Sequence, residues 1–438
     1  MLPIVRFPRI VEQQATWFDT VFTTDEQRKH FREYVTGLIV GNEATVTAIN
    51  QLFLGHNDQS SLNKFATQSE WDENALNRQR VRMELDRLFR RPIRAQAGSL
   101  IIDDTLAHHT KCKMEGLAYL WDHAEQQYAW AHDVVTSYYV NRSDQFPVDF
   151  RLWYQFQAKK EKALLQQTSQ ALNKMSNLAD YRQQLTSLLA FHVREQMYRT
   201  KTSLAAELVQ GAVELNVPFS VVLFDSWFLH NELIDPIEDL GKDWVGGCPK
   251  DRLVLFNDHW IQLQQYLQTI PASAYRPTQV FDHTYWAFTK VLTFKSLRRR
   301  RFRMVASYDN PDLKGEPFLV ISNRKDWERT RILLTYHDRW PTETFNEDIK
   351  GDLGFEDYQL HKLRGIRRHW YLCLAAYSLL GEQGCPGRSR QGVEVPFEST
   401  GQRCRAVMDE VLGHLVAWIA QQVKDGIAAK IISQTLLA

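Results

Sequence analysis

The segment Ser99-Leu100-Ile101-Ile102-Asp103-Asp104-Thr105 decides the fold class, because a short apolar run passes directly into two acids. An apolar run without alternation is typical of a strand that is buried on both faces. A second run of this kind, Phe219-Ser220-Val221-Val222-Leu223-Phe224, also ends in an acid, Asp225. We expect both strands to end at their acids in one α/β sheet, so that the carboxylates face the crevice in which such sheets bind ligands.

The rest of the chain changes character several times. Apolar residues at helical spacing fill the first ninety or so residues, and Thr24-Asp25-Glu26-Gln27 is typical of a capped helix start. We expect a helical domain over residues 1–95, the first part of a sheet-containing core over 96–256, a strand-containing insertion over 257–326, the second part of the core over 327–380, and a linker with C-terminal helices over 381–438.

Individual elements of the core follow from the same patterns. β-branched and aromatic residues predict strands at Gly116 to Trp121 and at Tyr128 to Val140. Helices are expected from about Gln155 to Leu215, the last of them from Ser203 to roughly Asn216. The pieces Trp244 to Cys248 and Arg252 to Phe256 are expected to form one strand or a hairpin.

Composition excludes several classes of protein. The 438 residues are 44% hydrophobic and 24% charged, which is typical of an ordinary soluble protein with two to four domains. No run approaches eighteen apolar residues, and the N-terminus lacks an export signal, so we expect no membrane span and a cytoplasmic location. The five cysteines include no C-x-x-C pair, which argues against a disulfide framework and against a zinc ribbon.

A polar motif near residue 340 carries the chemistry. Tyr336, Arg339, Glu343 and Lys350 have the spacing Y-x2-R-x3-E-x6-K, which places them near one face of a continuous helix. A carboxylate among cations and a hydroxyl is suited to holding a metal ion against a phosphodiester. The alternative is a solvated helix face with an ordinary Arg–Glu pair, and Pro341 indicates that the helix begins only there.

Three carboxylates that converge in one crevice repel one another unless cations neutralise them. Asp225, Glu343 and one of the two adjacent acids Asp103 and Asp104 therefore suggest two divalent ions, roughly 3.5 to 4 Å apart. Glu347, one turn beyond Glu343, is a competing acid of lower rank.

Other candidates each have a structural alternative. The basic run Arg298, Arg299, Arg300 and Arg301 and the segment from Lys362 to Trp370 are suited to neutralising a phosphate backbone, although charge runs are often only solvated surface. Trp227 and Trp340 flank the acids and are candidates for stacking on a base or for core packing. His108, His109 and Cys112 have the character of metal ligands, but hairpin surface is the stronger interpretation.

With these motifs the chain resembles the DDE transposases of bacterial insertion sequences, in particular those with the Y-x2-R-x3-E-x6-K signature. The residues that carry the resemblance are Ile101-Ile102-Asp103-Asp104-Thr105, Leu223-Phe224-Asp225-Ser226 and the motif from Tyr336 to Lys350. It implies a ribonuclease-H-like catalytic core of mixed α/β sheet flanked by helices and interrupted by an insertion. It also implies Mg2+ or Mn2+, with two ions, as cofactor.

The resemblance assigns roles by position. Asp225 and Glu343 match the second and third catalytic acids and metal ligands, whereas the first is either Asp103, by its place after the strand, or Asp104, by the Asp-Thr pair. Tyr336, Arg339 and Lys350 match DNA-contacting residues, and we add Trp340 and the basic run from Arg298 to Arg301 as DNA-binding candidates.

These roles predict a DNA transposase, that is, an endonuclease and strand transferase that excises and inserts its own transposable element by cut-and-paste DNA recombination. Its expected partners are double-stranded DNA, as terminal repeats and target, and a second copy of itself in a synaptic homodimer in the bacterial nucleoid. The alternatives are a ribonuclease-H-like nuclease without strand transfer and a domesticated DNA-binding protein without turnover. The terminal-repeat sequence, the target preference, the second-strand chemistry and the mobility of the element stay open.

Overall fold

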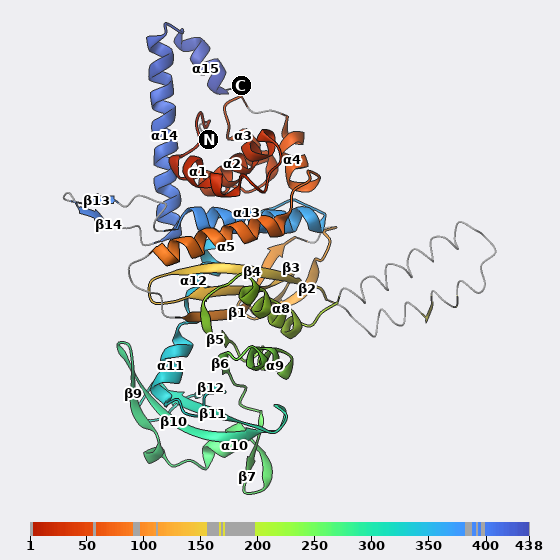
Figure 1. Ribbon diagram of the computed structural model, residues 1–438, viewed down its shortest axis with the longest axis vertical. Coiled ribbons are helices and arrows are strands. Elements are labelled where there is room, and N and C mark those ends of the chain that lie inside the picture. Colours follow the sequence, from red (N-terminus) through yellow and green to blue (C-terminus); the bar gives the residue numbers. More distant parts are fainter. Residues whose placement is uncertain are drawn as a thin grey trace.

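The computed structural model describes residues 3–55, 58–90, 97–110, 113–155, 166–167, 170, 198–381, 388–390, 393–395 and 399–437. Over these ranges the chain is a mixed α/β structure in which one twelve-stranded sheet runs from the core into the insertion. The N-terminal helices lie beyond one end of this sheet, and the insertion forms the opposite end of the molecule (Figure 1).

The N-terminal helical region forms as its apolar spacing predicts. Phe31, Tyr34, Val35, Leu38 and Ile39 are all buried along one helix, and the Thr24 side chain caps it by accepting a hydrogen bond from the Gln27 amide. The region contains α1 (Arg9–Gln14), the 3-10 helix η1 (Ala15–Phe18), α2 (Asp25–Val40), α3 (Val46–Gln51), α4 (Gln59–Thr67) and α5 (Glu73–Arg90).

The core sheet has the ribonuclease-H-like order. Three antiparallel strands lie beside two parallel ones in the order β4-β3-β1-β5-β6, and β2 pairs with the outer edge of β3. These strands are β1 (Gly98–His109), β2 (Ala118–Asp122), β3 (Gln127–Val140), β4 (Gln145–Trp153), β5 (Phe219–Phe224) and β6 (Asp243–Gly247). The expected α/β fold class is therefore confirmed.

Two details of the core differ from the sequence-based expectation. β1 does not end at its acids but continues to His109, because β3 pairs with it as far as Trp130. Only the parallel ladder with β5 stops at the acids, at the pair Ile102 and Phe224. β4 was not expected at all, since Pro147 interrupts its apolar pattern; the strand accommodates this proline beside a bulge in the β3–β4 ladder.

The insertion extends the same sheet. Its last strand, β12 (Phe318–Ser322), pairs antiparallel with β6, and β11 (Arg300–Tyr308) and β10 (His283–Phe294) follow in order. The expectation of one strand or a hairpin at residues 244–256 is wrong: β6 belongs to the core, whereas β7 (Leu253–Phe256) pairs with β8 (His259–Gln262) and β10. Short elements complete the insertion: α10 (Leu263–Gln268), η2 (Ala272–Ala274) and β9 (Arg276–Val280).

Helices cover both faces of the core sheet. α8 (Lys201–Glu214) and α9 (Asn231–Asp239) pack on one face, and α13 (Leu363–Leu379), with the fully buried Trp370, packs on the other. α8 confirms the end of the helical stretch predicted up to residue 215; most of the earlier part lies outside the described residues.

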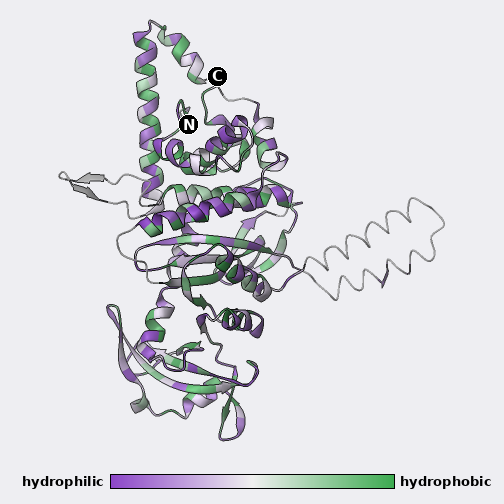
Figure 2. Cartoon of the chain, viewed as in Figure 1, coloured by the Kyte–Doolittle hydropathy of each residue, from purple (hydrophilic) through white to green (hydrophobic). Residues whose placement is uncertain are grey.

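The C-terminal part includes β13 (Arg388–Arg390) and β14 (Val393–Val395), followed by α14 (Thr400–Lys424) and α15 (Ala429–Leu437). α14 projects past the N-terminal helices, with polar and apolar residues alternating along it (Figure 2). Among the helices of the described ranges, none is long and apolar enough to cross a membrane.

Candidate active site at the end of the parallel strands

Two aspartates lie side by side where the parallel ladder ends. Ile102 and Phe224 are the last paired residues of β1 and β5, so Asp103 and Asp225 follow at equivalent positions of adjacent strands. The Asp225 Oδ1 atom accepts hydrogen bonds from the backbone amides of Trp227, at 3.0 Å, and Phe228, at 3.3 Å. These bonds fix the Asp225 carboxylate at the turn that follows β5.

A glycine on the neighbouring strand makes room for this turn. A Cβ atom on Gly247 of β6 would lie 2.7 Å from the backbone nitrogen of Ser226 and 3.2 Å from the carbonyl carbon of Asp225. Every side chain larger than hydrogen at residue 247 would therefore displace the segment that carries Asp225.

Arg339 joins Asp103 to Glu343. Its Nη1 atom lies 3.0 Å from Asp103 Oδ2, and its Nη2 atom donates to Glu343 Oε1. Arg339 and Glu343 are four residues apart, whereas Arg339 and Asp103 are separated by 236 positions. The guanidinium therefore holds the Glu343 carboxylate at the edge of the core sheet.

The motif does not lie on one continuous helix. α11 (Arg329–His337) ends before Arg339, and α12 begins at Pro341 and runs to Gly351, as the proline indicated. Hydrogen bonds of the i to i−3 type bridge the gap, from the Arg339 amide to Tyr336 O and from the Glu343 amide to Trp340 O. The chain keeps nearly helical geometry there, so Arg339 and Glu343 still share one side.

Tyr336 lies beside the same guanidinium, and its ring centroid is 5.9 Å from the Cζ atom of Arg339. Burial raises the pKa of the Tyr336 hydroxyl to about 12, and the charges of Asp225 and Asp103 raise it too, against the opposing effect of Arg339. The hydroxyl therefore stays protonated at neutral pH and is available as a hydrogen-bond donor.

Lys350 lies elsewhere. Its Nζ atom is 2.6 Å from the carbonyl oxygen of Leu106, three residues further along β1 than Asp103, and 3.2 Å from Glu356 Oε1. The four motif residues therefore do not meet at one point: Tyr336, Arg339 and Glu343 gather at Asp103, and Lys350 is paired with Glu356.

The electrostatics of the two aspartates indicate an excess of negative charge. Burial, together with the charges of Asp104 and Asp225 and against the opposing effect of Arg339, raises the pKa of Asp103 to about 7. Burial and the charge of Asp104 also raise the pKa of Asp225. A divalent cation would relieve this repulsion, and oxygen-only donors are the ligands preferred by Mg2+ and Mn2+. By donor chemistry Asp103, Asp225 and Glu343 suit such an ion; in this structure the Arg339 guanidinium lies between the carboxylates of Asp103 and Glu343.

Asp104 points to the opposite face of β1. Its Oδ2 atom lies 2.5 Å from the Nζ atom of Lys201, the first residue of α8, and the same ammonium contacts Asp133 of β3. Of the two adjacent acids, Asp103 therefore faces Arg339 and Glu343, and Asp104 faces a lysine.

The two tryptophans that flank the acids are both exposed. Trp227 and Trp340 each have 63% of their surface accessible, so neither is part of the core. Both rings are available to a ligand at this edge. Glu347, the competing acid, is exposed on α12.

The basic run in the insertion divides into arginines that pair with carboxylates and arginines for which the described part of the chain provides no ion pair. Arg298 and Arg300 form ion pairs with Asp235 of α9, and Arg300 also pairs with Glu238. Arg299 and Arg301 are exposed. Of the four arginines of the predicted run, only Arg299 and Arg301 are therefore exposed without an ion pair to α9.

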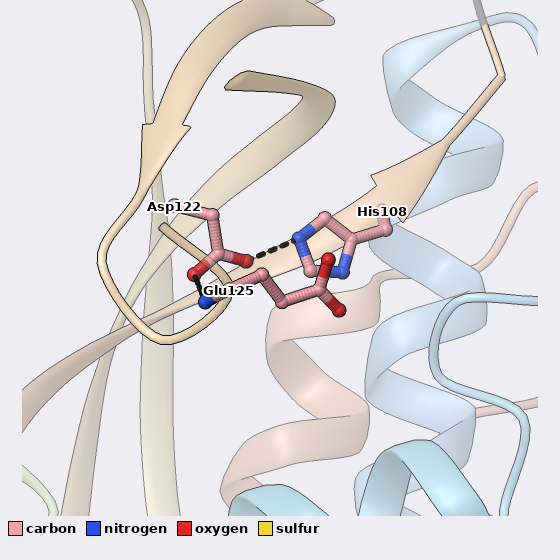
Figure 3. Close-up of side chains that lie close together, drawn as sticks. All are labelled: His108, Asp122 and Glu125. Carbon is pink, nitrogen blue, oxygen red and sulfur yellow. Dashed lines mark hydrogen bonds and ion pairs between the residues drawn. The ribbon is translucent and has the colours of Figure 1, made fainter. Parts of the chain in front are cut away.

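A histidine further along β1 belongs to a separate cluster with Asp122 and Glu125, whose ligand atoms lie within 4.8 Å of one another (Figure 3). The Nε2 atom of His108 is 2.8 Å from Asp122 Oδ2, and Asp122 Oδ1 accepts from the amides of Ala124 and Glu125. Asp122 thus closes the β2–β3 turn. His108 and His109 themselves lie at the end of β1 and not in a loop, and Cys112 lies outside the described residues.

Sequence reasoning missed Lys201 and Asp133. Lys201 lies 97 positions from Asp104 in the sequence. Asp133 is the only acid in β3, and a lone acid within a predicted strand was the signal available for it.

Comparison with known proteins gives one family. Residues 18–265, more than half of the chain, match the model of a family described as DDE superfamily endonuclease. The matched range includes Asp103, Asp104 and Asp225 and ends before Glu343. The chain matches no curated protein.

Proposed function

The chain belongs to the DDE superfamily endonucleases, and from that premise we propose that it is a DNA transposase of a bacterial insertion sequence. In this proposal Asp103, Asp225 and Glu343 are the catalytic acids. The protein cuts the ends of its own element and joins them to target DNA.

One observation carries the proposal: Arg339 holds Glu343 against Asp103, which lies beside Asp225 at the end of the parallel strands. Glu343 comes from a part of the chain beyond the family match, yet Arg339 links it to Asp103, which lies within that match. A solvated helix face would not require this contact with a buried strand.

The three acids would hold Mg2+ or Mn2+, with two ions as the proposed complement. Such ions activate a water or a 3′-hydroxyl and stabilise the leaving oxygen. Arg339 favours the charged form of Asp103, whose pKa burial otherwise raises. The protonated Tyr336 hydroxyl is placed to donate a hydrogen bond to a phosphate oxygen beside the acids.

Exposed groups around the site support DNA as the substrate. Trp227 and Trp340 offer aromatic faces on which bases can stack. Arg299 and Arg301 present charge on the insertion, and Lys350 of α12 contacts the backbone of β1 at Leu106, three residues beyond Asp103. We assign recognition of the terminal repeats to the N-terminal helices and pairing of two ends to a homodimer.

The test is a cleavage assay with labelled duplexes taken from the DNA that flanks the reading frame, in Mg2+. Nicking at a defined end by the wild-type chain, lost in Glu343→Gln and retained in the matched variant Glu347→Gln, is the expected result. Products joined to a second duplex would separate a transposase from a nuclease that only cuts.

Tight binding without cleavage by the wild-type chain, in either Mg2+ or Mn2+, would contradict the proposal. That outcome would favour a DNA-binding protein without turnover.

A further inference from the structure

A buried charge cluster lies directly behind the catalytic edge, on the face of β1 opposite Asp103. The Lys201 Nζ atom is 2.5 Å from Asp104 Oδ2 and 2.5 Å from Asp133 Oδ2. Asp104 and Asp133 share this face because β1 and β3 pair antiparallel, with Val135 opposite Asp104 and Asp133 opposite Leu106. One ammonium thus sits between two carboxylates from neighbouring strands.

The cluster is not an ordinary surface ion pair. The Asp133 side chain is 3% exposed and that of Lys201 17% exposed. The Lys201 Nζ atom also lies 5.4 Å from the ring centroid of Trp153 and 5.8 Å from that of Trp227, so aromatic faces surround the ammonium. Removing it would leave two carboxylates without a counter-charge in a buried place.

The second carboxylate oxygen of Asp133 points to further capacity for a cation. Oδ1 of Asp133 is buried and has no hydrogen-bond partner in the part of the chain that the structure describes. Buried acceptors without partners are rare in proteins. With the ammonium removed, the cluster offers oxygen ligands from Asp104 and Asp133, the donor type that a divalent ion takes.

The position of the cluster along β1 gives it mechanical importance. The parallel ladder with β5 ends at Ile102, so beyond this residue β1 is held by backbone pairing with β3 alone. Two residues beyond Ile102, the ion pair between Lys201 and Asp104 attaches β1 to α8. This contact holds the strand where Asp103 must keep its place.

We propose that Lys201 is a positioning residue that acts as a fixed internal cation: it is the shared counter-charge of Asp104 and Asp133, fixes β1 beneath Asp103, and keeps divalent ions off this second acidic pair. The positioning part rests on the proposed function of Asp103 as a metal ligand. The exclusion of divalent ions from the second pair does not.

The first test measures Mn2+ binding at equilibrium, by calorimetry on the full chain. The background carries Asp103→Asn and Glu343→Gln, which disable the proposed catalytic ligands. Adding Lys201→Met is expected to create one further Mn2+ site per chain, and adding Asp133→Asn to that variant is expected to abolish it. A folded Lys201→Met variant that binds no more Mn2+ than the background would overturn the proposal.

If Lys201→Met is insoluble, the folding of a second variant provides the test. Folding of Lys201→Met combined with Asp133→Asn, judged by circular dichroism, would support the role of Lys201 as a counter-charge, because the second substitution restores the net charge of the wild-type cluster without restoring the lysine. Failure of this double variant to fold would mean that Lys201 acts through packing alone and would overturn the proposal.

The second test measures single-turnover DNA cleavage. Lys201→Met is expected to cut about 100-fold more slowly with little change in DNA affinity, as a misplaced catalytic group does, and Lys201→Arg is expected to regain at least tenfold of this loss. Lys242→Met is the matched control, because Lys242 contacts the carbonyl of Phe219 at the other end of β5 and, among the described residues, forms no ion pair with a carboxylate.

Cleavage by Lys201→Met at the wild-type rate would overturn the positioning role. If the wild-type chain itself does not cut DNA, the proposed function fails, whereas the Mn2+ result still decides the role of Lys201 as a cation.

Discussion

Gly247→Ala tests whether the close approach of β6 sets the position of Asp225. The new Cβ atom would lie 2.7 Å from Ser226 N and 3.2 Å from the carbonyl carbon of Asp225. Atoms of this size rest about 3.5 Å apart or more, so the turn after β5 must retreat by roughly 0.5 to 1 Å. A shift of this size at a catalytic group costs about 100-fold in rate, or about 2.7 kcal/mol of activation free energy.

The assay compares the Mg2+-dependent cleavage rate and the free energy of unfolding of two variants. Gly247→Ala should cut about 100-fold more slowly and lose about 1–3 kcal/mol of stability through overpacking. Gly413→Ala is the control: in α14 a Cβ at residue 413 meets nothing within 4 Å, so activity should not change and stability should rise by up to about 1 kcal/mol. A folded Gly247→Ala protein that cuts within threefold of the wild-type rate would refute this account of Asp225.

Two further predictions concern acid stability and DNA affinity. His369 is fully buried between the Tyr34 hydroxyl and the Gly354 carbonyl, and burial lowers its pKa to about 4 from an ordinary 6.5. The neutral His369 therefore costs no stability above pH 6.5, but as pH falls from 6.5 toward 4 the free energy of unfolding should decrease by up to about 3 kcal/mol. His369→Gln should flatten the dependence of the unfolding free energy on pH over this window, measured by urea titrations. An unchanged dependence on pH in the variant would contradict the prediction. Arg301→Ala should reduce the salt dependence of DNA binding by about one released counterion. Arg300→Ala should not, because Arg300 is already paired with Asp235 and Glu238. Equal slopes of binding constant against salt concentration for the two variants, measured by fluorescence anisotropy, would argue against a DNA contact of Arg301.

Much of the fold could be predicted because local patterns encode it. The apolar runs before Asp103 and Asp225 are strands of one sheet, and the spacing from Phe31 to Ile39 gives a buried helix face. Pro341 marks the start of α12 for a local reason as well, since proline is accommodated in a first helical turn.

What could not be predicted depends on partners far away in the sequence. β1 continues past its acids only because β3 is long enough to pair with it, and no residue near Asp103 reports the length of β3. The different partners of Asp103 and Asp104 could not be predicted either, because Arg339 and Lys201 are distant in the sequence and approach β1 from opposite faces.

The pairing of β12 with β6 also has a consequence for the synthesis of the protein. β6 leaves the ribosome long before β12, so its outer edge has no strand partner until residue 322 has emerged. An open edge beside buried apolar strands is a template for pairing between chains. Chains that stop before Phe318 should therefore aggregate even though they contain both aspartates, so synthesis through β12 becomes a condition for solubility, as synthesis through Glu343 is for the proposed active site.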